Sequence, residues 1–222
     1  QGKRYLDALA GIAVCGLGHA HPRLTRVLQE QVGRLIHTSN IYEITLQERL
    51  GDRLAAISGM ESVFFCNSGC EANEAAIKLA RLYGHKHEIE APTIIVMEKA
   101  FHGRTIATLT ATGSRKAQAG FEPLLGGFVR VPFDDLEAVR RVAVNNRNVV
   151  AVLVELIQGE GGINICGADY LTGLYHRRGL YGKAEPLLRD VLRAREKKLG
   201  AHHPFTIACG ARLRELYLDQ GK

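Results

Sequence analysis

Two alternating patterns of apolar residues run from residue 1 to about residue 171. Four short apolar, largely β-branched runs predict strands: SVFF (62–65), TIIVM (93–97), FVRV (128–131) and VVAVLVEL (149–156). Four other segments carry apolar residues at helical spacing: 23–36, 46–57, 71–84 and 134–144. Strands that alternate with helices in this way predict an α/β domain with three layers and a mainly parallel sheet.

The pattern changes near residue 171, and we expect a domain boundary there, between 1–171 and 172–222. Downstream of it the apolar positions follow helical spacing only, and one phrase recurs after 42 residues: Leu171, Leu174, Tyr175 and Gly179 recur as Leu213, Leu216, Tyr217 and Gly221. An apolar helical stripe lies between the two copies. This recurrence predicts a short helical repeat.

Composition indicates a soluble globular protein: 46% of the 222 residues are hydrophobic and 23% are charged. No run approaches the roughly 18 apolar residues of a membrane span, and no signal-peptide pattern is present. We therefore expect a cytoplasmic protein without a membrane partner.

The net charge of +6 lies entirely in the tail, because residues 172–222 hold 11 basic and 5 acidic residues whereas residues 1–171 hold 18 of each. The tail tyrosines occupy repeat-packing positions (Tyr175, Tyr181, Tyr217). A charged helical face, rather than a nucleic-acid-binding surface, is the better interpretation.

Cysteine and histidine spacing suggests no metal site. The five cysteines are an odd number without a CxxC pair, which predicts free thiols. Three histidine pairs have spacings that a metal can use, but no carboxylate or cysteine completes any of them; they are His19 with His21, His85 with His87, and His202 with His203.

The segment FFCNSGCEANEAAIKLAR (64–81) contains a turn of small residues between an apolar run and a helix. Asn67, Ser68 and Gly69 allow the backbone to approach a ligand, and a helix N-terminus offers unpaired N–H groups and partial positive charge. Phosphate is the ligand that suits this corner. The alternative is an ordinary turn without a ligand.

Two further polar, glycine-bearing segments follow predicted strands: KAFHGRT (99–105) and VELIQGEGG (154–162). Ligands bind at the carboxyl edge of parallel α/β sheets. There Phe101 is suited to stack on a planar ring, Arg104 to bind a carboxylate, and Glu155 and Glu160 to meet ligand charges. The alternatives are that Phe101 is a core residue, His102 a turn residue and Glu160 a solvated charge.

These segments, with YLDALAGIAVCGLGHAHP near the N-terminus, resemble the class III, pyridoxal-phosphate-dependent aminotransferases, in particular the acetylornithine type. The resemblance covers residues 1–171 and implies part of the large domain of fold type I. It implies that Ser68, Gly69 and Cys70 bind the cofactor phosphate, and that Phe101, which stacks on the pyridine ring, and His102 contact the cofactor. It further implies that Arg104 receives the substrate α-carboxylate and that Glu160 controls substrate entry.

The implied reaction moves the δ-amino group of N-acetylornithine to 2-oxoglutarate. The substrate is therefore a small amino acid, and the family forms homodimers. Family members need a lysine that bonds covalently to the cofactor and a buried aspartate beside the pyridine nitrogen. Both follow the QGEGG segment in the family, whereas this sequence leaves the family pattern at Leu171.

No residue after 171 is a good substitute. The aspartates, Asp190 and Asp219, lie in charged helical surroundings, and Lys197 lies in EKKLGAHHP, which imitates the family's lysine segment without a preceding strand. Lys99 is near Phe101, but the family gives it no such role. We therefore expect the chain to be catalytically inactive.

The tail AEPLLRDVLRAREKKLGAHHP, with its flanking repeats, resembles a tetratricopeptide repeat of the kinesin light chain type. The resemblance implies about one helical unit and a protein partner, although about three units are normally needed to bury the apolar faces. Two alternatives to an enzyme therefore stay open: a protein-interaction module, and a non-functional fusion of unrelated segments.

Overall fold

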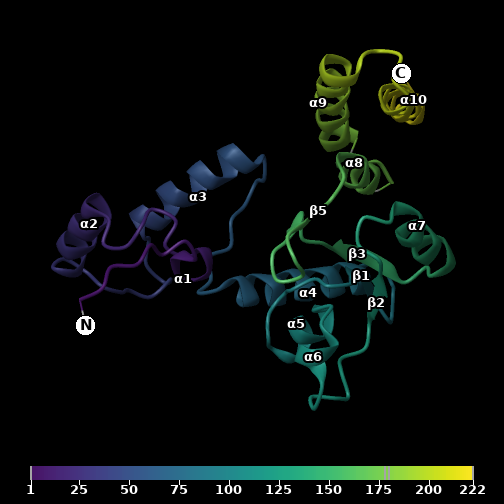
Figure 1. The fold of residues 1–222 in the computed structure, drawn as a ribbon. Helices are drawn as coiled ribbons and strands as arrows, with labels where there is room; N and C mark the ends of the chain where they lie inside the picture. Colours follow the sequence, from purple (N-terminus) through teal and green to yellow (C-terminus); the bar gives the residue numbers. More distant parts are fainter. Residues whose placement is uncertain (1, 178, 180, 222) are drawn as a thin grey trace. The chain divides into compact units, whose positions relative to one another are not determined.

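The computed structural model describes residues 2–177, 179 and 181–221. The chain forms two compact units, Gln1–Phe64 and Phe65–Lys222 (Figure 1).

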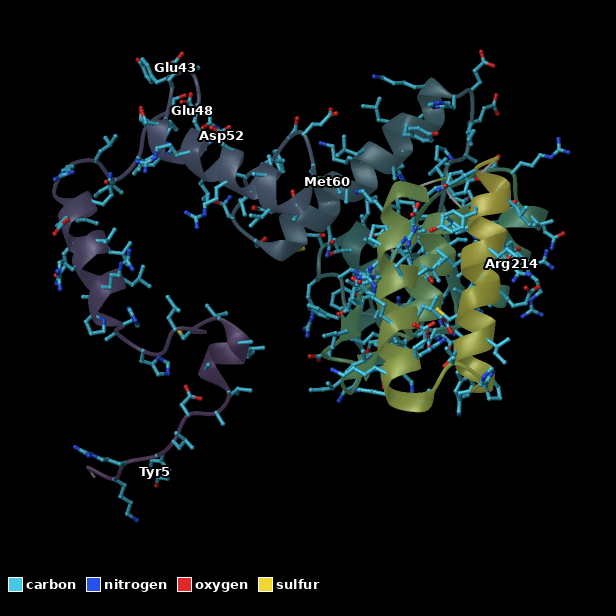
Figure 2. All side chains as sticks on the ribbon, turned by 90° about the horizontal axis from the view of Figure 1, so that it is seen from above. Tyr5, Glu43, Glu48, Asp52, Met60 and Arg214 are labelled. Carbon is cyan, nitrogen blue, oxygen red and sulfur yellow. The ribbon has the colours of Figure 1, made fainter. Side chains whose placement is uncertain are left out.

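The first unit is helical and has no core of its own. It contains α1 (Ala10–Ala13), α2 (Pro22–Val32) and α3 (Thr45–Ser58), and none of its described residues is buried. Two of these helices match the predicted helices at 23–36 and 46–57. On α3, Glu48 and Asp52 are exposed one turn apart, and their side chains are visible in Figure 2.

The second unit contains the sheet. Strands β1 (Thr93–Met97), β2 (Phe128–Val131) and β3 (Val149–Leu153) pair in parallel in the order β2-β1-β3. A two-stranded antiparallel hairpin follows, formed by β4 (Ile157–Gln158) and β5 (Asn164–Ile165). The predicted parallel sheet is therefore present, with β1 as its central strand.

The predicted strand at 62–65 is wrong. Within the described part of the chain these residues pair with no strand, and the Phe64 side chain is 71% exposed. An apolar, β-branched run favours an extended backbone, but a strand also needs a neighbour to complete its hydrogen bonds. The predicted strand 149–156 is likewise shorter, because β3 ends at Leu153.

Helices cover both faces of the sheet (Figure 1). Ile94 and Val96 of β1 pack with α4 (Gly69–Lys86) and α5 (Ile106–Ala111), whereas Ile95 and Met97 pack with α7 (Leu136–Asn145). A short helix, α6 (Arg115–Gln118), follows α5. Side chains of a strand alternate between the two faces, so one strand supplies both halves of a three-layer core.

Replacing Gly84 by alanine is expected to destabilise the protein by about 1–3 kcal/mol. An alanine normally stabilises a helix interior relative to glycine by about 0.5–1 kcal/mol. At Gly84, however, the added Cβ would lie 2.6 Å from Pro92 Cγ and 3.0 Å from Val150 Cγ1, and a proline ring moves little.

Urea unfolding of Gly84→Ala and of the control Gly210→Ala measures whether each substitution lowers or raises the free energy of unfolding. Nothing lies within 4 Å of a Cβ at Gly210, so the control should be more stable than the wild type by about 0.5–1 kcal/mol. Two variants that shift stability in the same direction would contradict the expected packing of α4 on Pro92.

As far as the structure describes them, residues 168–221 form three helices: α8 (Ala168–Arg177), which leads into the tail, α9 (Tyr181–Leu199) and α10 (Pro204–Asp219). Their core is formed by Ala184 and Leu188 of α9 with Cys209 and Leu216 of α10. The repeated positions Tyr175, Leu213 and Tyr217 pack against this core, which agrees with their apolar spacing in the sequence.

Helix α8 belongs to both cores of this unit. Tyr170 is buried in the sheet core, where its hydroxyl donates to Met97 Sδ at 3.1 Å. One turn later, Tyr175 packs against the tail core. The expected domain boundary at residue 171 therefore lies inside a continuous helix.

Candidate active site

Three segments meet beside the carboxyl ends of β1 and β3: the N-terminus of α4, the loop 99–105 and the segment 155–162. Ser68 is the N-cap of α4, and its Oγ accepts a hydrogen bond from the Glu71 amide at 3.2 Å. The Glu71 carboxylate accepts one from the Asn67 amide at 2.5 Å. These two bonds resemble a capping box, and they fix the start of the helix.

The corner that Ser68 begins can receive an anion. In the described part of the chain, the amides of Gly69 and Cys70 have no acceptor. Apart from the adjacent residues and the backbone of α4 itself, no heavy atom lies within 4 Å of a Cβ built on Gly69, so a ligand can approach the chain closely at this residue. Two free N–H groups at the start of an 18-residue helix favour a small anion such as phosphate.

Cys70 joins this corner to the loop. Its Sγ lies 3.4 Å from Thr108 Oγ1 and 3.5 Å from Thr105 Oγ1. These hydroxyls, Thr108 first, lower the pKa of the Cys70 thiol to about 7. Gly103 permits the contact, because a Cβ there would lie 2.6 Å from the sulfur. The Thr105 hydroxyl also donates to the Glu74 carboxylate.

His102 is buried, with 4% of its surface exposed. Its amide donates to Thr112 Oγ1 at 3.0 Å, and its carbonyl accepts from Asn73 Nδ2 at 2.8 Å. Its Nε2 has no partner among the described residues. Burial, followed by the nearby charge of Arg130, lowers the pKa of His102 to about 4. The imidazole is therefore neutral at pH 7.

Phe101 and Arg104 lie together at the surface. The Phe101 ring is 37% exposed, so it is not a core residue, and Arg104 Cζ lies 5.8 Å from its centroid. The Phe101 amide donates to Glu155 Oε2 at 2.8 Å. Burial raises the pKa of Glu155, although backbone hydrogen bonds from Phe101 and Gly159 oppose the shift. Aromatic ring, guanidinium and carboxylate thus share one edge.

Of the other candidates, Lys99 and Glu160 belong to the segments that meet here, whereas no contact among the described residues brings Asp190, Asp219 or Lys197 to this edge. Glu160 is exposed in the turn between β4 and β5. Asp219 pairs with His176 at 2.8 Å, and Asp190 lies 3.6 Å from Arg193. Lys197 is exposed in the last turn of α9. Lys99 is exposed and lines a cavity of about 590 Å³ beside Gln158.

Several residues of this edge were not predicted from the sequence. Gln158 is fully buried, and its Nε2 donates to the Glu98 carbonyl at 2.7 Å. Asn73, Thr105 and Thr108 connect α4 to the loop. The sequence signal for Gln158 was its position as the first residue of the QGEGG segment. Its hydrogen-bond partner could not be predicted, because Glu98 lies 60 residues away in the sequence.

Neither a metal cluster nor a bilayer-spanning helix is present in the described ranges. Among residues 2–177, 179 and 181–221, no three His, Cys, Asp or Glu side chains gather as metal ligands. Within the same ranges, every helix is too short or too polar to cross a bilayer.

Comparison with known proteins identifies the family of the chain. The class-III aminotransferase family matches residues 1–177. An acetylornithine aminotransferase from Nitrosomonas europaea is 71% identical over 174 residues, which are 78% of this chain and 44% of that protein. The chain thus spans less than half the length of this relative.

Solved structures agree with the fold. An ornithine aminotransferase from Toxoplasma gondii superposes with a TM-score of 0.73 at 31% identity, over 85% of this chain and 43% of that one. A second structure of the Toxoplasma gondii enzyme, with pyridoxal phosphate partially occupying its active site, gives a TM-score of 0.70 at 30% identity, over 82% and 41% of the two chains.

Proposed function

The chain belongs to the class-III aminotransferases, and on that premise we propose that residues 1–171 form a cofactor-binding part of an acetylornithine-type aminotransferase. Pyridoxal phosphate is the cofactor that the family implies. The observation that carries the proposal is the pair of unpaired amides, Gly69 and Cys70, at the start of a helix that contacts the loop of the exposed Phe101 through Cys70 and Asn73.

The residues fit this cofactor. We assign its phosphate to Ser68, Gly69 and Cys70 at the start of α4, where helix charge favours an anion. The half-exposed Phe101 offers a ring face for stacking on the pyridine ring. His102 supports the loop from its buried position. When bound, the cofactor supplies an electron sink for amino-group transfer.

Two residues are assigned to the substrate. Arg104 holds its guanidinium over the Phe101 ring and is suited to bind the α-carboxylate of an amino acid. Glu160 is an exposed charge in the turn between β4 and β5, and we assign it the control of substrate entry. The identity with acetylornithine aminotransferases favours N-acetylornithine and 2-oxoglutarate as substrates, and the family favours a homodimer.

The 222-residue polypeptide itself is proposed to be inactive. Transamination needs an amine that holds the cofactor and moves its proton. Among the described residues, Lys99 has an exposed side chain and a backbone that lies close to Gly113 and Gly161, and Lys197 is an exposed residue of α9. In the part of the chain that the structure describes, neither lysine side chain forms a hydrogen bond or an ion pair with Phe101 or with the start of α4.

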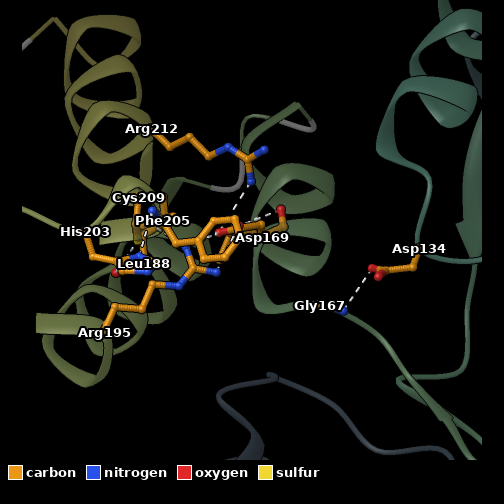
Figure 3. Close-up of polar contacts among 10 residues, drawn as sticks. Asp134, Gly167, Asp169, Leu188, Arg195, His203, Phe205, Cys209 and Arg212 are labelled. Carbon is orange, nitrogen blue, oxygen red and sulfur yellow. Dashed lines mark hydrogen bonds and ion pairs between the residues drawn. The ribbon is translucent and has the colours of Figure 1, made fainter. Parts of the chain in front are cut away.

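The tail is proposed as a second, repeat-like segment attached to the aminotransferase part through α8. Arg195 binds Asp169 with both terminal nitrogens, at 3.4 and 3.1 Å, and Arg212 approaches the same carboxylate at 3.4 Å (Figure 3). The packing of the repeated tyrosines favours a tetratricopeptide-like unit, and hence a protein partner. A fusion of unrelated segments is the competing explanation for the change of pattern at 171.

The intact chain is expected to bind 4-deoxypyridoxine 5′-phosphate and to produce no glutamate from acetylornithine and 2-oxoglutarate above a free-cofactor control. The probe has no aldehyde, so surface lysines cannot react with it. Equilibrium dialysis measures the binding and a coupled glutamate assay measures the turnover. Turnover above the control would contradict the proposed inactivity.

A matched pair of variants locates the binding. Gly69→Asp places a negative charge beside the free amides and should weaken probe binding by about tenfold or more, because like charges repel at short range. Gly69→Asn has the same shape without the charge and should stay within about threefold of the wild type. Equal effects of both variants would place the phosphate elsewhere.

A further inference from the structure

The loop that follows β1 has an unusual backbone. Lys99 lies in the left-handed region, at φ +59°, which residues with side chains rarely adopt and which persists only where the surroundings determine it. Phe101 and Arg104 follow within five residues. The backbone conformation of Lys99 therefore affects the positions of the Phe101 and Arg104 side chains.

Two glycines from different segments hold this backbone between them. A Cβ on Gly113 would lie 2.3 Å from Lys99 N and 2.8 Å from Ala100 N. A Cβ on Gly161 would lie 2.5 Å from Lys99 O and 3.0 Å from Lys99 Cβ. Because most of these are backbone atoms, neither glycine can gain a methyl group without a shift of the loop.

Hydrogen bonds fix the peptide groups on both sides of Lys99. The Glu98 carbonyl accepts from the fully buried Gln158 at 2.7 Å, and the Ala100 carbonyl accepts from the Gly113 amide at 2.7 Å. The Phe101 amide then donates to Glu155 at 2.8 Å. The path from β1 to Phe101 is thus held by hydrogen bonds at Glu98, Ala100 and Phe101, and by the close approach of the two glycines at Lys99.

We propose that Gly113 and Gly161 are positioning residues that clamp the Lys99 backbone and thereby place the Phe101 ring against the cofactor's pyridine ring. This inference rests on the proposed function. The two glycines touch neither cofactor nor substrate in this role; they act through the backbone of residues 98–101.

The three glycines of the QGEGG segment differ in the space around them and in their backbone conformation. Only Gly161 approaches the Lys99 backbone, whereas nothing lies within 4 Å of a Cβ on Gly159 or Gly162. Gly162 has φ +112°, so a side chain there would strain the backbone, and Gly159 has no such restriction. Gly159→Ala is therefore a matched control for Gly161→Ala, two residues away in the same turn.

The Kd values of two ligands, one with a pyridine ring and one without, distinguish misplacement of the Phe101 ring from loss of the fold. We expect Gly161→Ala to raise the Kd of 4-deoxypyridoxine 5′-phosphate by about three- to tenfold, the range of one aromatic contact. Its Kd for inorganic phosphate, measured by ³¹P NMR, should change by less than about twofold, because the start of α4 is intact. Gly159→Ala should change neither value.

A double-mutant cycle tests whether Gly161 acts through the ring. In a Phe101→Leu background, adding Gly161→Ala should cause no further loss of affinity for 4-deoxypyridoxine 5′-phosphate, called the ring probe below. Gly113→Ala provides a second variant, with Gly126→Ala as its control because nothing lies within 4 Å there. It should give the same selective loss.

Other outcomes overturn the inference. These are an unchanged ring-probe Kd in Gly161→Ala, an equal loss of both ligands, or an additive effect with Phe101→Leu. If both alanine variants lose the native circular dichroism spectrum, the glycines serve folding and not placement. Failure of the wild type to bind the ring probe would instead refute the proposed function.

Discussion

Replacing Leu216 by alanine is expected to lower the free energy of unfolding by about 2–5 kcal/mol. Leu216 is fully buried between α9 and α10, in contact with the cluster of Leu188 and Cys209. Removal of its side chain deletes apolar contacts and leaves a cavity that a three-helix tail fills poorly. The effect is large because this core contains few residues.

Leu218→Ala is the control, since Leu218 lies on the same helix but is 68% exposed. Its free energy of unfolding should stay within about 0.5 kcal/mol of the wild type. Urea unfolding followed by circular dichroism measures both variants. The Leu216 variant should unfold in one transition, because α8 links the tail core to the sheet core. A separate unfolding transition of the tail, shifted to lower urea concentration while that of the sheet core stays unchanged, would contradict this linkage.

Acidification should destabilise the wild type relative to a His102→Gln variant, by up to about 3 kcal/mol near pH 4. Burial lowers the pKa of folded His102 to about 4, below the roughly 6.5 of an unfolded histidine. Between these values the unfolded chain binds a proton that the folded chain does not. Stability therefore falls as the pH decreases through this window, and the histidine makes no such contribution above it.

Measurement of the free energy of unfolding at several pH values between 4 and 8 checks this expectation. At pH 8 both chains are neutral at position 102, so their difference there gives the packing effect of the substitution alone. That value is subtracted at each lower pH. Parallel curves for the two proteins would show that the histidine is not protected from protonation in the folded state.

Local sequence predicted the strands β1, β2 and β3 of the parallel sheet, although β3 is shorter than predicted. The run at 93–97 became β1 because β-branched residues with apolar side chains on both faces suit a central strand. The run at 62–65 looks similar in the sequence but pairs with nothing in the described chain. Residue type expresses a preference for extended backbone; it does not supply the neighbouring strand.

The site was predictable only in part for the same reason. Phe101 and Arg104 were found because they directly follow a predicted strand. Gln158 and Asn73 were missed because each acts on a backbone atom 60 or 29 residues away. Contacts of this kind depend on how the segments fold together, and a side-chain amide carries no local sign of its distant acceptor.

The shared helix α8 also determines where the chain can be divided for experiments. A deletion beginning at 172 would cut the helix after its fourth residue and remove Leu174, which packs beside Tyr170 in the sheet core. A deletion beginning after Gly179 keeps all of Ala168–Arg177. Fragments intended to separate the aminotransferase part from its tail are therefore better designed around the turn at 179 than around the change in sequence pattern.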